Sequence, residues 1–430
     1  MLLALAKYYL SLHYWSAASV ASIKRMQLKK FRKLFDHAKR HSAFYREFYG
    51  DHGVLDLKIE CLDDIGKVPI TRKALLRNNS LRDVMTCDLD ERIRIHSTSG
   101  SSGEPFQIAY NHFEDYTAHA RVGRALMAAG YHPLKKTVLL SRYEPGHSFE
   151  IEDDLALNDF LQGKIGLFRR ELISVFTPVE TIIRKLEETK PFLLWSTPSI
   201  IEIIALELKK SGRKLDIPLL LLMAENISPA LIRLCRERIA QKFIDLYGCM
   251  ESPSIGFGID QIDTKSIFVN STLVEVLNPR PIGDSVAGDV VITNLINHTM
   301  PLIRYDLGDC VQVLDPDPFP SKKIGRICGR SDDIIYFGDH YTLTYHQAYQ
   351  LFRAFHECIQ YKFIERAAGK IVLQLKVDEA ADKKKVTLSA LQKWDEKYPD
   401  YPLVIEWKDE FAADRKTGKF KVIEKFDQTA

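Results

Sequence analysis

Residues 97–105 read STSGSSGEP, and this stretch guides the interpretation of the whole chain. It contains five hydroxyl residues and two glycines. Polar and apolar residues alternate in 92–96 and nearly so in 106–110, which predicts a strand on either side. Glycines let a backbone approach an anion and hydroxyls add hydrogen-bond donors, so this composition predicts a phosphate-binding loop. A flexible hairpin tip is the alternative, because Ser and Gly also favour turns.

The composition is that of an ordinary globular protein with a large core. The chain has 430 residues, of which 46% are hydrophobic, and its 60 basic and 57 acidic residues give a net charge of +3. This balance gives no strong positive electrostatic field that would attract nucleic acid, so we expect no nucleic-acid partner. Seven cysteines are scattered without a Cys-x-x-Cys pair, which is typical of reduced thiols in the cytoplasm. We therefore predict a cytoplasmic protein.

The first residues are apolar but do not predict a membrane span. Lys7 interrupts the apolar run, and no stretch of about 18 apolar residues occurs anywhere, so we expect neither a secretory signal nor a transmembrane segment. Leu, Tyr and Trp are nevertheless crowded in residues 2–15. An amphipathic or membrane-associated helix is one interpretation of this segment.

Strand and helix patterns alternate through the middle of the chain. Strands are predicted at 137–141, 172–176, 192–195, 219–223 and 243–247, with helical patterns between most of them. This spacing predicts a parallel sheet covered by helices. Such sheets bind ligands beyond the carboxyl ends of their strands.

The pattern changes after about residue 265 to short β segments, which indicate a more antiparallel subdomain. Beyond residue 333 we predict a helix at 344–355, a strand at 371–377, a helix at 385–397 and a strand at 403–407. The expected fold class is therefore α/β. It has a large N-terminal domain (1–332) with helix-covered mixed or parallel sheets and a β-rich subdomain, and a small α+β C-terminal domain (333–430).

Five short motifs occur in order along this framework: the 97–105 loop, YGCME at 247–251, RYDLGD at 304–309, GRSDD at 329–333 and GK at 418–419. Each is weak alone, but their order and spacing resemble the adenylate-forming superfamily of acyl-CoA synthetases and ligases. The chain is most similar to the phenylacetate-CoA ligase branch, with its capsule-biosynthesis and coenzyme F390 synthetase-like relatives. VPITRKAL at 68–75 and PLIRY at 301–305 are similar to segments of that branch.

The resemblance implies a ligase that uses ATP and Mg²⁺. A carboxylate attacks the α-phosphorus of ATP and gives an acyl-adenylate and pyrophosphate. The aromatic and apolar content of the region between the first loop and Tyr247 suits an aryl or medium-length acid. The acyl group then passes to CoA or to the phosphopantetheine of an acyl carrier protein. Two alternatives stay open: an adenylyl transferase that leaves AMP on an acceptor, and a catalytically degenerate ATP-binding protein.

The resemblance also implies roles for individual residues. The implied ATP-binding residues are Ser99, Gly100, Ser101, Ser102, Gly103, Tyr247, Gly248, Asp309 and Arg330. Glu251 matches the Mg²⁺-ligand glutamate, Lys419 matches the catalytic lysine of the mobile C-terminal domain, and Asp332 is the implied hinge. Glu104 after the second loop glycine and the segment 334–341 depart from the usual pattern, which leaves the acceptor open.

Ordinary structural roles are the alternatives for these residues. Asp309 could cap a turn, and Glu251 could be a first-turn helix acid favoured by the helix dipole. Lys419 could be one of several solvated lysines, with Lys416 and Lys421 as rival catalytic candidates.

The acyl pocket is expected between the first loop and Tyr247. The residues predicted to line it are Trp195, Ser196, Met223 and Ala224, with Glu225 and Asn226 beside them. Core packing is the alternative explanation for their apolar character.

Overall fold

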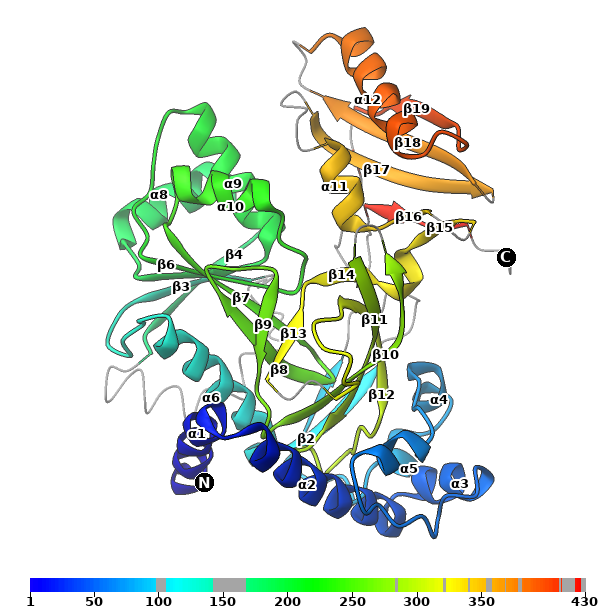
Figure 1. Ribbon diagram of the computed structural model, residues 1–430. Helices are drawn as coiled ribbons and strands as arrows, with labels where there is room; N and C mark the ends of the chain where they lie inside the picture. The colour runs from blue at the N-terminus through cyan, green and yellow to red at the C-terminus, as the bar shows by residue number, and fades with distance from the viewer. Residues whose placement is uncertain are drawn as a thin grey trace. The chain divides into compact units, whose positions relative to one another are not determined.

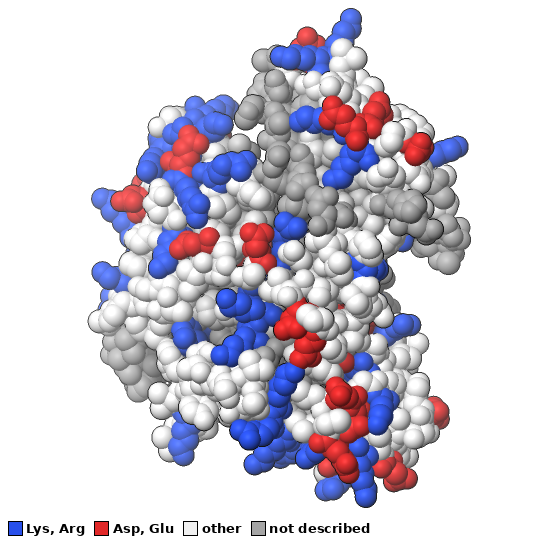
Figure 2. All heavy atoms as spheres, viewed as in Figure 1, with Lys and Arg blue, Asp and Glu red and all other residues white. Residues whose placement is uncertain are grey.

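The computed structural model describes residues 1–97, 106–141, 168–282, 285–319, 322–338, 341–352, 358–367, 369–377, 381–409, 411 and 422–426. The chain divides into two compact units (Figure 1). The first consists of Met1–Gln27, Asn111–Thr272 and Ser321–Lys323, and the second of Leu28–Tyr110, Leu273–Pro320 and Ile324–Ala430. Charged side chains of both signs are spread over the face shown in Figure 2, in keeping with the near balance of basic and acidic residues.

An eight-stranded sheet forms the framework of the first unit, with the order β13-β9-β8-β7-β6-β5-β3-β4. Strands β3 to β7 pair in parallel, whereas β8 and β9 continue antiparallel. Parallel neighbours need crossover connections, which α8, α9 and α10 supply. The bounds are β3 Thr137–Ser141, β4 Arg170–Ser174, β5 Leu193–Ser196, β6 Leu219–Met223, β7 Lys242–Cys249, β8 Ser252–Ile259, β9 Thr264–Ile267 and β13 Lys323–Gly325; α1 Leu2–Ala17, α6 His112–Ala128, α8 Val179–Thr189, α9 Pro198–Lys210 and α10 Pro229–Arg238.

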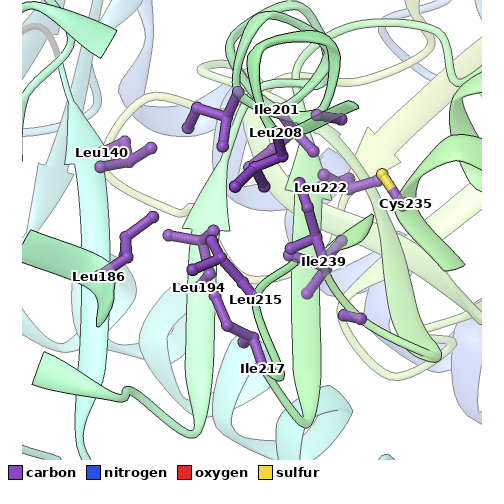
Figure 3. Packing of buried hydrophobic residues seen from close by; sticks show 14 of the residues in the cluster. Leu140, Leu186, Leu194, Ile201, Leu208, Leu215, Ile217, Leu222, Cys235 and Ile239 are labelled. Atoms are coloured by element: carbon purple, nitrogen blue, oxygen red, sulfur yellow. The ribbon is translucent and has the colours of Figure 1, made fainter. Parts of the chain in front are cut away.

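The three crossover helices bury one face of this sheet (Figure 3). Leu194 of β5 and Leu222 of β6 lie among side chains from α8 and α9, including Leu186 and Leu208. Burying each such side chain contributes about 1.5–3 kcal/mol relative to leaving it in water. This packing fixes the positions of the carboxyl ends of the parallel strands, and therefore of the loops that follow them.

The second unit contains a sheet with the order β10-β11-β12-β14, and β12 carries most of the RYDLGD motif. The helix α2 (Val20–His41) begins in the first unit and continues into this one. The remaining bounds up to residue 333 are α3 Ala43–Asp51, η1 Asp63–Lys67, α4 Lys73–Arg77, α5 Leu81–Val84, β1 Ile93–Ser97, β2 Gln107–Asn111, β10 Thr272–Ile282, β11 Ser285–Asn294, β12 Tyr305–Gln312, β14 Ile327–Arg330 and η3 Ser331–Asp333.

Residues after 334 have a hydrophobic core of their own, built around Trp394, Phe337 and Phe363. Its four-stranded sheet has the order β19-β18-β17-β20. The bounds are β15 Ile335–Phe337, β16 Tyr341–Leu343, α11 Tyr345–Phe352, β17 Cys358–Ala367, β18 Lys370–Val377, α12 Lys383–Lys397, β19 Leu403–Trp407 and β20 Ile423–Glu424. The helices and strands predicted here are confirmed to within a few residues. The domain boundary after 332 stays a prediction, which the separate core supports.

Thr71 lies just before α4 but does not cap it. The N-cap residue of α4 is Arg72. Thr71 instead pairs with Tyr305 as a parallel β-bridge, with its N–H donating to Arg304 O at 2.9 Å and its Oγ1 donating to Ile303 O at 2.9 Å. The segments 68–75 and 301–305, both part of the family resemblance, are therefore bonded to each other.

Arg304 joins these segments to β10 of the second unit through hydrogen bonds. Its buried guanidinium donates to both carboxylate oxygens of Glu275, with Nη2–Oε1 at 2.9 Å, and to the carbonyl oxygens of Gly66 and Val68. Glu275 is fully buried. Burial alone raises the pKa of the Glu275 carboxyl, and the bonds from Arg304 oppose that shift. The pair is thus a buried charge pair whose remaining donors are used by backbone carbonyls.

His298 provides a test of pH-dependent stability. Burial, followed by the nearby charges of His37 and Lys33, lowers its pKa from 6.5 to about 4. Between these values the unfolded chain binds a proton that the folded chain does not, so the free energy of unfolding falls as the pH falls from about 6.5 to about 4. We expect His298→Gln to flatten this decline in urea unfolding curves. His52→Gln, at an exposed position, should leave it unchanged; an equal decline in both variants would contradict the assignment.

Candidate active site

The YGCME motif forms the end of β7 and the turn into β8, as predicted for a loop at the carboxyl end of a parallel strand. Gly248 has no room for a side chain, because an added Cβ would lie 2.5 Å from Ser254 N. Glu251 lies in the turn and is 6% exposed. The glycine thus lets the two strands approach closely, and the turn between them buries Glu251.

Trp195 and Met223 lie at the carboxyl ends of neighbouring parallel strands and contact each other, with Trp195 Nε1 donating to Met223 Sδ at 2.9 Å. Ser196 follows Trp195 within β5, so its side chain points to the opposite face of the sheet. It is buried, and its Oγ has no hydrogen-bond partner among the described residues. Trp195 and Ser196 therefore cannot line one pocket from the same side of the strand.

The loop after β6 begins in an unusual conformation. Ala224 has φ 70°, which a residue with a side chain rarely adopts outside constrained sites. The next residue, Glu225, accepts hydrogen bonds from Ser199 N and Ser199 Oγ, both at 2.9 Å. These bonds join the β6 loop to the first turn of α9, so the carboxylate of Glu225 holds the loop in place.

Asp309 and Arg330 face each other across β12 and β14, where they are register partners. Arg330 Nη1 donates to Asp309 Oδ1 at 3.2 Å. Gly308, with φ 68°, precedes the aspartate, and a Cβ there would lie 2.8 Å from Arg330 Nη2. The left-handed backbone favours glycine here, whereas the exposed end of Arg330 could move aside. The Gly-Asp motif thus presents a carboxylate oriented by an arginine.

The predicted hinge follows directly from β14. The backbone forms the short helix η3 over Ser331–Asp333, which contains Asp332, and then enters β15. Ser331 Oγ donates to Asp289 Oδ1 at 2.9 Å, and Arg280 Nε donates to the hydroxyl of Tyr336 at 3.1 Å. Arg280 and Asp289 form a two-bond ion pair at 2.7 and 2.9 Å.

This second pair was missed by sequence reasoning. Burial opposes the charge of Asp289, but the bonds from Arg280, Asn278 and Ser331 outweigh it and lower the pKa of the carboxyl. The adjacency of β10 and β11 in the sheet brings Arg280 and Asp289 together, and no local pattern signals it.

The predicted residues fall on both units. Trp195, Ser196, Met223, Ala224, Tyr247, Gly248 and Glu251 belong to the first, and Asp309, Arg330 and Asp332 to the second. Ser99, Gly100, Ser101, Ser102, Gly103 and Lys419 lie outside the described residues. Within the described ranges, no three His, Cys, Asp or Glu residues are grouped as metal ligands.

Curated relatives bear on the family. No family model matches the chain. The phenylacetate-coenzyme A ligase of Pseudomonas putida is 26% identical over 334 residues, which cover 74% of this chain and 73% of that protein. The enzyme of the same name from Escherichia coli K12 is 24% identical over 335 residues, at 74% and 73% coverage. The predicted resemblance to the phenylacetate-CoA ligase branch is confirmed.

Solved structures agree on the fold of this phenylacetate-CoA ligase-like chain. A 2-hydroxyisobutyryl-CoA ligase in complex with 2-HIB-AMP has a TM-score of 0.73 at 18% identity and covers 95% of this chain and 90% of its own. The o-succinylbenzoate-CoA synthetase of Bacillus subtilis has a TM-score of 0.53 at 12% identity, at 76% and 67% coverage. The predicted α/β fold class is confirmed.

Proposed function

We propose that this chain is an ATP-dependent acid–CoA ligase that activates a carboxylic acid as its acyl-adenylate and releases pyrophosphate. The observation that carries the proposal is the match to phenylacetate-CoA ligases over about three quarters of both chains. In the second step the thiol of CoA displaces AMP. CoA is proposed as acceptor because the named relatives are CoA ligases.

The Asp309–Arg330 pair supports an ATP-binding role for this part of β12. A carboxylate accepts two hydroxyl hydrogen bonds well, which suits the ribose of a nucleotide. Arg330 Nη1 donates to one oxygen of Asp309 at 3.2 Å, and the Arg330 side chain is 54% exposed. We assign Asp309 to the ribose hydroxyls and Arg330 to orienting that carboxylate.

Glu251 fits a magnesium ligand although no acidic cluster occurs among the described residues. Mg²⁺ is commonly bound by one or two carboxylates with substrate phosphates and water completing its shell. When bound, the ion would neutralise phosphate charge so that a carboxylate can approach the α-phosphorus. The turn between β7 and β8 holds Glu251 in place for this role.

Replacing Glu251 with Gln should lower pyrophosphate exchange at limiting Mg²⁺ by about tenfold or more, because removing even a supporting group of a metal site commonly costs that much. Raising the Mg²⁺ concentration should restore part of the rate. Glu225→Gln is the matched control, and its Mg²⁺ dependence should equal that of the unchanged protein. Loss of exchange in Glu251→Gln that is independent of Mg²⁺ would remove the metal role.

The contact between Trp195 and Met223 supports an acyl pocket with an aromatic wall, and we propose an aryl acid as substrate. The test is a panel of carboxylic acids, phenylacetate first, assayed by exchange of labelled pyrophosphate into ATP. Release of AMP with CoA thioester formation supports the ligase. AMP found on an acceptor would indicate the adenylyl transferase, and ATP binding without exchange a degenerate protein.

We also propose that the protein is cytoplasmic. None of the seven cysteines forms a disulfide, which suits the cytoplasm that supplies ATP and CoA.

The proposal also gives the C-terminal domain a role in catalysis. Lys419 is proposed to enter the site from the domain after residue 332, which turns about Asp332 between the two half-reactions.

A further inference from the structure

A buried arginine of α6 donates to the strand that follows the Glu251 turn. Arg121 is 3% exposed. Its Nε and Nη2 both donate to Pro253 O, at 3.1 and 2.5 Å, and its Nη1 donates to Tyr8 Oη at 3.0 Å and to Thr117 Oγ1 at 3.2 Å. The acceptors of this cation among the described residues are a carbonyl and two hydroxyls. Arginine is rarely buried this deeply without an anionic partner, so its position indicates a role beyond packing.

The strand β8 bulges immediately after the Glu251 turn. Cys249 of β7 pairs with Ser252. Two residues back along β7, Tyr247 pairs with Gly256, which lies four residues further along β8. The strand β8 therefore has two residues more than β7 between the same two pairs. Bulges beside functional sites redirect the side chains next to them, so this bulge affects where the carboxylate of Glu251 lies.

The peptide unit between Pro253 and Ser254, inside this bulge, is constrained at both of its polar atoms. Arg121 bonds to its carbonyl oxygen, and Gly248 lies so close to its nitrogen that an added Cβ would be 2.5 Å away. Ser254 has φ 61°, which a residue with a side chain adopts only where the surrounding structure imposes it. The two bonds from Arg121 fix the direction of the Pro253 carbonyl and so help to impose this conformation.

The first helix of the chain contributes to the same arrangement. The helix α1 packs beside α6, where Tyr9 Oη donates to Met127 Sδ at 2.8 Å (Figure 1). Tyr8 Oη accepts from Arg121 and is 2.5 Å from Ser271 Oγ. Within the described ranges, no helix is long and apolar enough to cross a membrane. The apolar N-terminal segment thus has a role inside the first unit, in the packing around Arg121.

We propose that Arg121 is a positioning residue, which sets the place of Glu251 through the carbonyl of Pro253. The inference rests on the magnesium role proposed for Glu251. The two residues are two positions apart in the chain, so a shift of the Pro253 carbonyl moves the turn that carries the carboxylate. Outer contacts that orient a metal ligand without touching the metal commonly change metal affinity by about 10- to 100-fold when they are lost.

A purely structural role is the competing explanation. Arg121 joins α1, α6 and β8, so its loss would lower the melting temperature whatever happens at Glu251. The two explanations differ in what else changes, because only a positioning residue alters the Mg²⁺ requirement. Leu208→Ala is the matched control, since it removes a fully buried side chain of the α9 core and lowers stability without changing the β7–β8 turn.

The first measurement is hydrogen–deuterium exchange of the full chain without ligands, followed by mass spectrometry of peptides covering residues 247–257. Arg121→Gln should raise amide exchange in these peptides by about tenfold or more, because the turn then opens more readily. Arg121→Lys keeps the charge but offers one ammonium in place of two parallel donors, so it should raise exchange less. Tyr8→Phe should have the smallest effect, since Arg121 Nη1 still donates to Thr117.

The second measurement is the Mg²⁺ concentration that gives half-maximal exchange of labelled pyrophosphate into ATP. Arg121→Gln should raise this concentration by about tenfold or more, with most of the rate restored at high Mg²⁺. Arg121→Lys should lie between Arg121→Gln and the unchanged protein. Thermal melts define a temperature at which each variant is folded, and if Arg121→Gln does not fold, Arg121→Lys serves in both measurements.

An equal Mg²⁺ requirement in the Arg121 variants and the unchanged protein would overturn this inference and leave the ligase in place. An equal rise in Leu208→Ala, or unaltered amide exchange over residues 247–257, would overturn it too. If the unchanged protein shows no pyrophosphate exchange with any acid, the proposed function fails, and with it the metal role that Arg121 supports.

Discussion

Arg304→Ala is expected to lower the free energy of unfolding by about 3–5 kcal/mol, the usual cost of removing one partner of a buried charge pair. The variant leaves Glu275 fully buried without its charge partner, and removes the donors to Gly66 O and Val68 O. The β-bridge between Thr71 and Tyr305 would at the same time lose the support of the Arg304 side chain beside it. Urea unfolding monitored by circular dichroism measures the effect.

Two further variants separate the effect of the Arg304 charge on stability from that of its hydrogen-bond geometry. Arg304→Lys keeps the charge but cannot bond to both oxygens of Glu275 and to two carbonyls, so it should recover only part of the loss. Arg304→Met with Glu275→Leu removes both charges and should be less destabilised than Arg304→Ala. A single Arg304→Ala variant within about 1 kcal/mol of the unchanged protein would show that the pair contributes little, as most exposed pairs do.

Lys419→Ala is expected to lower acyl-adenylate formation by about 100- to 1,000-fold, the usual cost of losing one donor to a charge that develops during the reaction. A carboxylate and a triphosphate repel each other, and a lysine at the reacting oxygens offsets that repulsion. The assay is exchange of labelled pyrophosphate into ATP, with the acid that the substrate panel identifies. Thioester formation from a supplied acyl-adenylate should be much less affected, because that step no longer brings two anions together.

Lys416→Ala and Lys421→Ala are the matched controls, since they change the same charge within three residues. Both should retain most of the exchange activity. If either loses as much as Lys419→Ala, that lysine takes the catalytic role; if all three lose little, the catalytic cation lies elsewhere.

Local patterns predicted most of the elements because their periodicities are strong. The run of four leucines at 219–222 is buried as β6, and the strand at 371–377 was predicted within one residue of β18. β8 was not predicted, because its Ser and Gly residues are untypical of a strand. Gly256 and Gly258 are nevertheless suited to it, since the neighbouring backbone lies too close for a side chain. The sequence also carries no signal for the left-handed conformation of Ala224, which depends on the loop it enters.

Candidate residues were predicted from motifs, and motifs do not show which way a side chain points. Trp195 and Ser196 are adjacent in the sequence but face opposite sides of β5. Arg304 lies inside the RYDLGD motif, yet its guanidinium stabilises the fold through Glu275. The Arg280–Asp289 pair joins residues of two strands that no motif connects.

The hydrogen bonds around the predicted hinge would have to break if the lobe after residue 332 turned there. Ser331 and Tyr336 are each held by one hydrogen bond to the Arg280–Asp289 pair, whose side chains are 28% and 23% exposed. If the lobe turns at this hinge as proposed, water would replace these two bonds, and a difference of a few kcal/mol between the arrangements would leave the minor one at about 0.1–10%. Reversing a population of about 1% then needs a ligand that binds the minor arrangement about 10⁴-fold more tightly. Turnover would therefore depend on which of nucleotide and acyl-adenylate is bound.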